Sequence, residues 1–307
     1  MNIFEIKKKS LNNVYIVDNG DKYICHLSNF DNNFECRVLD LLRNRVSDIP
    51  HFCVGGIVDT KFISYPFCED FELYQLDSAL PHTKKYFSLM KYIEGDTISH
   101  LTNDNYIELA RILRNIHTVT FDFEPNSDIH TRESKDKLRE YIDNVGNAFG
   151  EDTFTFMNNV FDEISDIDFD RLDSVIVHGD VKPDNMLVGT DSRLKLIDFG
   201  NAFIGTRLID VIRVIMWCML HNDRVDYESI DVFCKEYFIS NKMTNYEKKV
   251  FDKLFRYCLL YNFAKDKSLC VSGDIPIEYV ETTGKIWYKY LNEKNVLDKI
   301  KEIVLCN

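Results

Sequence analysis

Two short polar motifs, each set among apolar residues, constrain this chain more than any other feature of its sequence. Residues 177–188 contain Asp180 and Asn185, five positions apart, and residues 196–200 contain Asp198, thirteen positions beyond Asn185. The apolar residues around them predict short strands near 174–178, 185–188 and 194–197. Each of the three polar side chains is therefore expected beside a short strand.

This arrangement supplies the groups that phosphoryl transfer requires. One carboxylate accepts or orients the proton of an attacking hydroxyl, while an Asn oxygen and a second carboxylate hold Mg²⁺ against the phosphates. Magnesium favours oxygen ligands and takes only a few of them from the protein. The pattern therefore indicates Mg²⁺-dependent transfer of the γ-phosphoryl group of a nucleoside triphosphate to a hydroxyl.

With these motifs the chain resembles the kinase superfamily, in particular the aminoglycoside phosphotransferase and choline kinase family. That family carries His-Gly-Asp, here ending at Asp180, where protein kinases carry His-Arg-Asp. The resemblance implies that Asp180 is the catalytic base, that Asn185 and Asp198 bind Mg²⁺, and that His178 supports the loop. It also implies a charge-stabilising role for Lys182, which matches a lysine of the protein Ser/Thr kinases.

The segment after Asp198 argues against a protein kinase. Gly205 and Asp210 follow within twelve residues, and a helix predicted over 207–221 begins at once. A protein kinase needs a long activation segment and a peptide-docking platform there. The short connection is similar to that of the small-molecule kinases, in which the residue matching Asp210 braces the catalytic loop.

The hydrophobic periodicity predicts an α+β protein with a bilobal, protein-kinase-like fold. Strands are expected at 14–17, 22–27, 56–64 and 86–90, with an Asn19-Gly20 hairpin and one helix over 34–42. Helical periodicity takes over afterwards. We expect residues 1–92 to form an antiparallel β nucleotide-binding lobe and residues 93–307 a mainly helical catalytic and substrate-binding lobe. Helices are predicted near 106–117, 135–149, 153–165, 207–221, 227–240, 246–264 and 285–304.

The nucleotide side departs from the family at one position. The resemblance places Lys9 and Ser10 in the turn over the triphosphate, and His26 where a phosphate-contacting Lys or Arg is usual, with Glu35 on the next helix. Three explanations stay open. In the first, Glu35 raises the pKa of His26 above its unperturbed value of about 6.5, at which a histidine is mostly neutral at pH 7, and so keeps it protonated. In the second, a lysine of residues 7–9 takes the place of His26. In the third, nucleotide binding is lost.

Two further positions complete the family match. Met90 and Ile93 fall in the linker that reads a purine mainly through its backbone, so ATP and GTP are equally compatible donors. His117 also matches a family position, and we expect it to be a buried, hydrogen-bonded histidine.

The acceptor is expected to be a small cationic molecule. Residues 162–173 hold six carboxylates just ahead of the catalytic strand, where aminoglycoside kinases carry an acidic acceptor segment. Asp166, Asp168 and Asp170 are the candidates, and a solvated helix end is the alternative. The aromatic residues Trp217, Tyr227, Tyr257 and Tyr261 would suit choline, although helical spacing makes most of them core residues. An aminoglycoside-type antibiotic is the first candidate, followed by choline, ethanolamine or another small alcohol.

Composition narrows the partners and the compartment. The formal net charge is −13, of which residues 96–200 carry −12, and this argues against nucleic-acid binding. The nine cysteines include no Cys-x-x-Cys pair, which favours reduced thiols in the cytoplasm. The most apolar run, 211–220, is about half the length that spans a bilayer. No membrane and no obligate protein partner are indicated, and a non-catalytic nucleotide-binding module is the rival that His26 keeps open.

Overall fold

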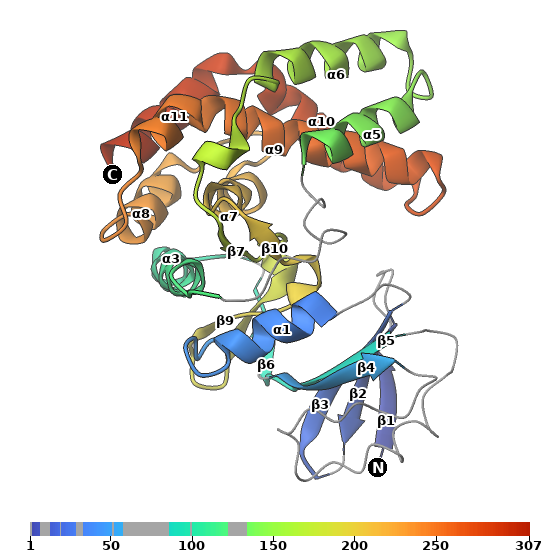
Figure 1. Cartoon of the computed structure of the whole chain (residues 1–307), viewed down its shortest axis with the longest axis vertical. Helices are drawn as coiled ribbons and strands as arrows, with labels where there is room; N and C mark the ends of the chain where they lie inside the picture. The colour runs from blue at the N-terminus through green and yellow to red at the C-terminus, as the bar shows by residue number, and fades with distance from the viewer. Residues whose placement is uncertain are drawn as a thin grey trace. The chain divides into compact units, whose positions relative to one another are not determined.

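The computed structural model divides the chain into two compact units (Figure 1). One unit comprises Met1–Ile98 with Asn185–Ala202, and the other comprises Ser99–Asp184 with Phe203–Asn307. The lobe boundary expected between residues 92 and 93 stays a prediction. The structure describes residues 2–6, 13–18, 20–28, 33–50, 52–57, 86–98, 100–121 and 134–307.

The first unit is built on a five-stranded antiparallel sheet with the order β1-β2-β3-β5-β4, which confirms the antiparallel start. The hairpin between β2 and β3 turns at Gly20, whose φ of +95° suits glycine and whose N–H donates to Asp18 Oδ1 at 3.1 Å. β4 begins four residues earlier than predicted, and residues 58–64 lie outside the described part. The strands are β1 (Asn2–Ile6), β2 (Asn13–Asp18), β3 (Lys22–Ser28), β4 (Phe52–Ile57) and β5 (Tyr86–Lys91).

Helix α1 (Asn33–Leu42) and a small second sheet also belong to the described part of this unit. Helix α1 buries one apolar face, including Phe34 and Val38, as predicted. The second sheet has the order β6-β8-β9. Gly95 is required in it, because a Cβ there would lie 2.5 Å from the Val188 carbonyl oxygen. Its strands are β6 (Gly95–Thr97), β8 (Met186–Gly189) and β9 (Leu194–Leu196), and the short helix η4 (Phe199–Asn201) follows β9.

The second unit is mainly helical, which confirms the α+β fold class. A two-stranded sheet in this unit pairs β7 (Val175–Val177) with β10 (Phe203–Gly205). The long helix α9 contacts α5, α6, α7, α10 and α11. None of the helices in the described residues has the length and apolar character needed to cross a membrane. The helices are α3 (Asn103–His117), α5 (Lys135–Val145), α6 (Glu151–Ile164), α7 (Leu208–Val214), α8 (Tyr227–Tyr237), α9 (Asn245–Val271), α10 (Ile277–Asn292) and α11 (Lys294–Cys306).

Two predicted helices differ from the structure. The helix expected over 285–304 is two helices, separated at Glu293, where ψ is 72°. The apolar positions do not reveal the break, because the seven-residue step from buried Tyr290 to buried Leu297 continues a helical stripe. The helix expected over 207–221 is α7 followed by a π-helical turn over Ile215–Met219.

A buried ion pair joins the beginnings of α7 and α9. Arg207 donates to Glu247 through Nε at 2.9 Å and through a terminal nitrogen at 3.0 Å, and Arg207 also contacts Asp173 at 3.1 Å. Glu247 is only 1% exposed, and with Thr244 it forms the capping box that starts α9. The pair therefore fixes where α9 enters the helical core.

Removing the charge of Glu247 should destabilise the protein strongly. In Glu247→Gln the buried Arg207 guanidinium loses its bidentate partner, and we expect the free energy of unfolding to fall by about 3 kcal/mol. The matched control is Asp252→Asn, which breaks a more exposed pair with Lys301 and should cost less than about 1 kcal/mol. Urea unfolding measures the free energy of unfolding of both variants. Equal losses in the two variants would contradict the structural importance of the buried Arg207–Glu247 pair.

Candidate active site

The loop after β7 is held by one buried carboxylate. Asp210, fully buried in α7, accepts hydrogen bonds from the backbone N–H groups of His178 at 2.7 Å and Gly179 at 2.9 Å. Gly179 has a φ of +80°, a conformation that favours glycine. The N–H of Asp180 in turn donates to His178 Nδ1 at 3.2 Å. The backbone leading into Asp180 is thereby fixed.

A second layer of side chains orients Asp210. His117 Nε2 lies 3.0 Å from Asp210 Oδ2, and His117 Nδ1 lies 2.6 Å from the hydroxyl of Tyr237. Since a carboxylate only accepts, His117 donates through Nε2 to Asp210. His117 is 5% exposed, so it is the buried, hydrogen-bonded histidine that the sequence predicts.

Asp180 itself remains accessible. Its side chain is 20% exposed, and its Oδ2 accepts from Lys182 Nζ at 2.8 Å. A partly exposed carboxylate on a fixed backbone can meet a hydroxyl without a change in the loop. The neighbouring ammonium of Lys182 supplies positive charge at the same point.

The two predicted metal ligands lie at adjoining strand ends in the first unit. Asn185 immediately precedes β8, and its carbonyl oxygen accepts from the N–H of Ile197 at 2.9 Å, one residue before Asp198. Asp198 has a φ of +66°, unusual for a residue other than glycine, and its Oδ1 lies 3.4 Å from the N–H of Gly200. The backbone bond holds the two residues side by side.

This donor set fits Mg²⁺. An amide oxygen and a carboxylate are hard oxygen ligands, and Mg²⁺ is usually held by one or two carboxylates together with waters and substrate phosphates. Within the described ranges no cluster of three or more His, Cys, Asp or Glu side chains could hold a metal alone. The arrangement therefore suits a cation shared with a nucleotide.

The predicted nucleotide contacts are placed in part. His26 lies in β3 with its Nδ1 3.9 Å from Glu35 Oε1 at the start of α1, so the proposed pair is brought together. Met90 is buried in β5 and Ile93 is half-buried just beyond that strand. Lys9 and Ser10 lie outside the described residues.

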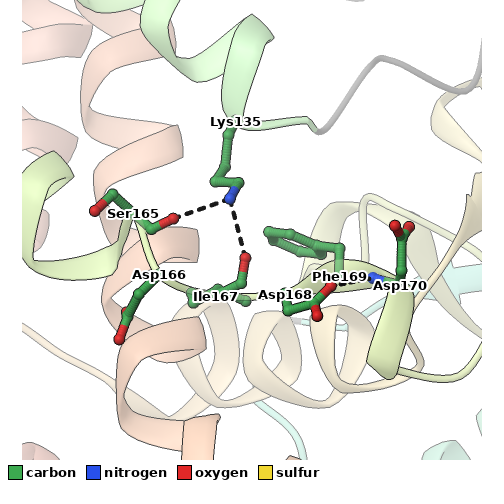
Figure 2. Close-up of a pocket in the computed structure, with 7 residues that line it drawn as sticks. All are labelled: Lys135, Ser165, Asp166, Ile167, Asp168, Phe169 and Asp170. Carbon is green, nitrogen blue, oxygen red and sulfur yellow. Dashed lines mark hydrogen bonds between the residues drawn. The ribbon is translucent and has the colours of Figure 1, made fainter.

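The acidic segment borders a pocket of about 360 Å³ (Figure 2). Lys135 of α5 points into the segment and donates to the carbonyl oxygens of Ser165 at 2.9 Å and Ile167 at 3.0 Å. Asp166 pairs with Lys253 at 2.6 Å, and this hydrogen bond lowers the pKa of Asp166. Asp168 accepts from the N–H of Asp170 at 3.2 Å.

The acidic segment and the loop with Asp180 lie on opposite sides of β7 along the chain. The segment precedes β7, whereas the loop with Asp180 follows it. The β7–β10 register pairs Val175 with Gly205 and Val177 with Phe203, and a three-residue strand is about 10 Å long. Asp166, Asp168 and Asp170 therefore belong to the end of β7 away from the catalytic loop, and their acceptor role stays a prediction.

Three residues near the catalytic loop were not predicted. Lys265 interacts electrostatically with Asp180, and Asp266 with Lys182. Tyr279 of α10, 43% exposed, interacts with both Asp266 and Asp180. The signal in the sequence was a run of three charged residues, 265–267, directly after the largely apolar stretch 257–264 of α9.

Asp266 differs from the other two residues because it is a buried carboxyl group with a raised pKa. It is 9% exposed, and its Oδ2 accepts from the Thr283 hydroxyl of α10 at 3.3 Å. Burial raises the pKa of Asp266 to about 6. The same physical cause, together with the nearby Arg213, lowers the pKa of Lys265. Groups of both signs, the buried Asp266 and the half-buried Lys265, therefore lie near the loop that carries Asp180 and Lys182.

The antiparallel first sheet, the helical second part and the loop fixed by Asp210 define a kinase-like phosphotransferase fold. A family model described as "Phosphotransferase enzyme family" matches residues 5–238. The chain belongs to this family, which confirms the resemblance stated from its motifs. A search of curated proteins found no match.

Solved structures agree on the fold at low identity. A spectinomycin phosphotransferase in complex with ADP and spectinomycin is 13% identical, with a TM-score of 0.63, covering 98% of this chain and 93% of that one. A choline kinase from Cryptosporidium parvum Iowa II is 12% identical, with a TM-score of 0.62, covering 100% and 92%. A GDP complex of an aminoglycoside 2'-phosphotransferase is 14% identical, with a TM-score of 0.56, covering 98% and 91%.

The raised pKa of Asp266 should appear in the pH dependence of stability. Because the folded-state value of about 6 lies above the ordinary 3.8, this group's stabilising contribution is full below the unfolded pKa and is lost as pH rises through the folded one. Asp266→Asn cannot titrate. From about pH 5 to about pH 7 it should lose about 1 kcal/mol less unfolding free energy than the wild type. Urea unfolding at the two pH values checks this, and identical pH dependences would contradict it.

Proposed function

We propose that this protein transfers the γ-phosphoryl group of ATP or GTP to a hydroxyl of a small cationic molecule. The observation that carries the proposal is the accessible Asp180 carboxylate on a loop whose backbone N–H groups are bound by buried Asp210. Because the chain belongs to a phosphotransferase family, we assign that carboxylate a role in phosphoryl transfer. We place the reaction in the cytoplasm.

Each residue has a stated task in this proposal. Asp180 orients the acceptor hydroxyl and takes its proton as the oxygen attacks phosphorus in line with the leaving oxygen. Lys182, 2.8 Å from Asp180, neutralises charge that develops on the transferred group. His178 and Asp210 keep the loop in place. Positioning and charge neutralisation supply most of the catalysis.

The nucleotide is assigned to residues of the first unit. Asn185 and Asp198 would hold Mg²⁺, which when bound neutralises charge on the phosphates and orients them. His26 with Glu35, or a lysine of the 7–9 run that includes Lys9 beside Ser10, would contact the phosphates. Met90 and Ile93 would lie along the purine.

The first candidate acceptor is an aminoglycoside-type antibiotic, and choline or ethanolamine is the alternative. The similar structures include enzymes named for both kinds of acceptor, at nearly equal TM-scores. Asp266 and the exposed ring of Tyr279 interact electrostatically with the catalytic loop, so we add them to Asp166, Asp168 and Asp170 as candidate contacts. A carboxylate and an aromatic face both attract an ammonium group.

Asp180→Asn should abolish acceptor-stimulated consumption of nucleotide. The amide keeps the shape of the side chain but cannot take the hydroxyl proton, and a loss of about a thousandfold in kcat is expected. The measurement is Mg²⁺-dependent turnover of ATP and, separately, GTP with a panel of aminoglycosides, choline and ethanolamine. Asp252→Asn, which lies outside the candidate contacts and pairs with Lys301, is the matched control.

The panel also decides between classes of function. Stimulation by one acceptor, lost in Asp180→Asn and kept in the control, supports the kinase and names its substrate class. If no acceptor stimulates turnover and neither nucleotide binds, His26 marks a non-catalytic module and the proposal is overturned.

The acceptor contacts can be separated by their effect on KM. We expect Asp266→Asn to raise the acceptor KM about tenfold at pH 7 with kcat nearly unchanged, because a charge that attracts the acceptor is removed away from the reacting atoms. Asp170→Asn should leave KM within about twofold. Steady-state kinetics with the best acceptor of the panel measure both, and the reverse order would assign the acceptor to the acidic segment.

A further inference from the structure

One carboxylate outside the catalytic motifs is tied to the strand that leads into Asp198. Asp48 follows α1 and is 7% exposed. Its Oδ1 accepts from Lys195 Nζ at 2.9 Å, and its Oδ2 binds the guanidinium of Arg193. Its backbone oxygen accepts from the N–H of Leu196 at 2.9 Å. One residue thus contacts three positions of the β8–β9 hairpin.

These contacts end next to the predicted metal ligands. Leu196, bonded to Asp48, is followed by Ile197, whose N–H donates to the Asn185 carbonyl oxygen at 2.9 Å. The next residue is Asp198, with its left-handed backbone. The chain from the Asp48 contact to Asp198 therefore contains only one intervening residue, and that residue is itself bonded to Asn185.

The same residue links this strand to the helix that carries Glu35. Asp48 lies six residues beyond the end of α1, in a segment whose Val46 and Ile49 are buried. A buried ion pair adds little net stability compared with apolar packing, but its geometry is specific. Two cations and one backbone N–H converging on a single residue suit a positional restraint.

We propose that Asp48 is a positioning residue that fixes the end of β9, and through it the spacing of Asn185 and Asp198 for a divalent cation. The inference rests on the proposed function for its catalytic consequence. Its structural content, that Asp48 restrains the backbone at residues 196–198, does not depend on that function.

The chain offers a matched control for this proposal. Asp191 binds the same Lys195 at 2.7 Å but is 49% exposed and lies within the β8–β9 connection. Asp191→Asn therefore removes an ion pair from Lys195 without loosening the link to α1. Asp48→Asn keeps the size of the side chain and its backbone oxygen while removing the charge that binds two cations.

The first readout is hydrogen–deuterium exchange in the protein without metal or nucleotide. In Asp48→Asn we expect the peptide containing Leu196 and Ile197 to exchange about tenfold faster than in the wild type, because local opening needs less free energy. In Asp191→Asn the rate should stay within about twofold. Faster exchange spread evenly over the protein, or unchanged exchange at this peptide, would overturn the proposal.

The second readout is the Mg²⁺ dependence of nucleotide turnover. Asp48→Asn should need about tenfold more Mg²⁺ for half-maximal activity, with most of kcat restored at saturation, as for residues that orient metal ligands. A fall in kcat with unchanged Mg²⁺ dependence would reduce Asp48 to a structural residue and overturn the proposal. Lys195→Met repeats both measurements if Asp48→Asn does not fold. Wild-type protein without Mg²⁺-dependent turnover would refute the proposed function alone, since exchange still tests Asp48.

Discussion

The hydrogen bonds from Asp210 to the backbone of the catalytic loop are the interaction on which the proposed chemistry depends. They satisfy two buried N–H groups that would otherwise cost free energy, and they place Asp180 at the surface of a fixed loop. His117 is hydrogen-bonded to Asp210 and, through its other ring nitrogen, to Tyr237. The buried carboxylate of Asp210 therefore fixes the loop that carries the proposed catalytic base.

The first unit uses the same principle with different chemistry. There the backbone bond between Ile197 and Asn185 brings the two predicted metal ligands together, and Asp48 binds the strand through its side chain and its backbone oxygen. In both units the predicted functional side chains stand at the ends of very short strands. Such strands have little stability of their own, so buried polar contacts fix their ends.

The sequence predicted what depends on local pattern. The strands around Asp180 and Asp198, helix α1 and most helices of the second unit follow from apolar spacing and were confirmed. It did not predict the break at Glu293, because the buried positions on either side of it, Tyr290 and Leu297, keep helical spacing. Nor did it reveal Asp48, Lys265 or Asp266, because their partners are distant in the sequence and isolated charges usually lie in solvent. The sequence also did not show which carboxylates lie near Asp180, because this depends on the length and direction of β7 in the folded chain.

The close approach of β6 and β8 limits which substitutions this sequence can accept during evolution. At Gly95 the Val188 carbonyl oxygen occupies the space that any Cβ would need. Asp96 and Thr97 on the same strand are exposed and meet no such limit. Related sequences that keep this strand pairing can vary at positions 96 and 97. A replacement of Gly95 by any other residue would require the pairing to be lost.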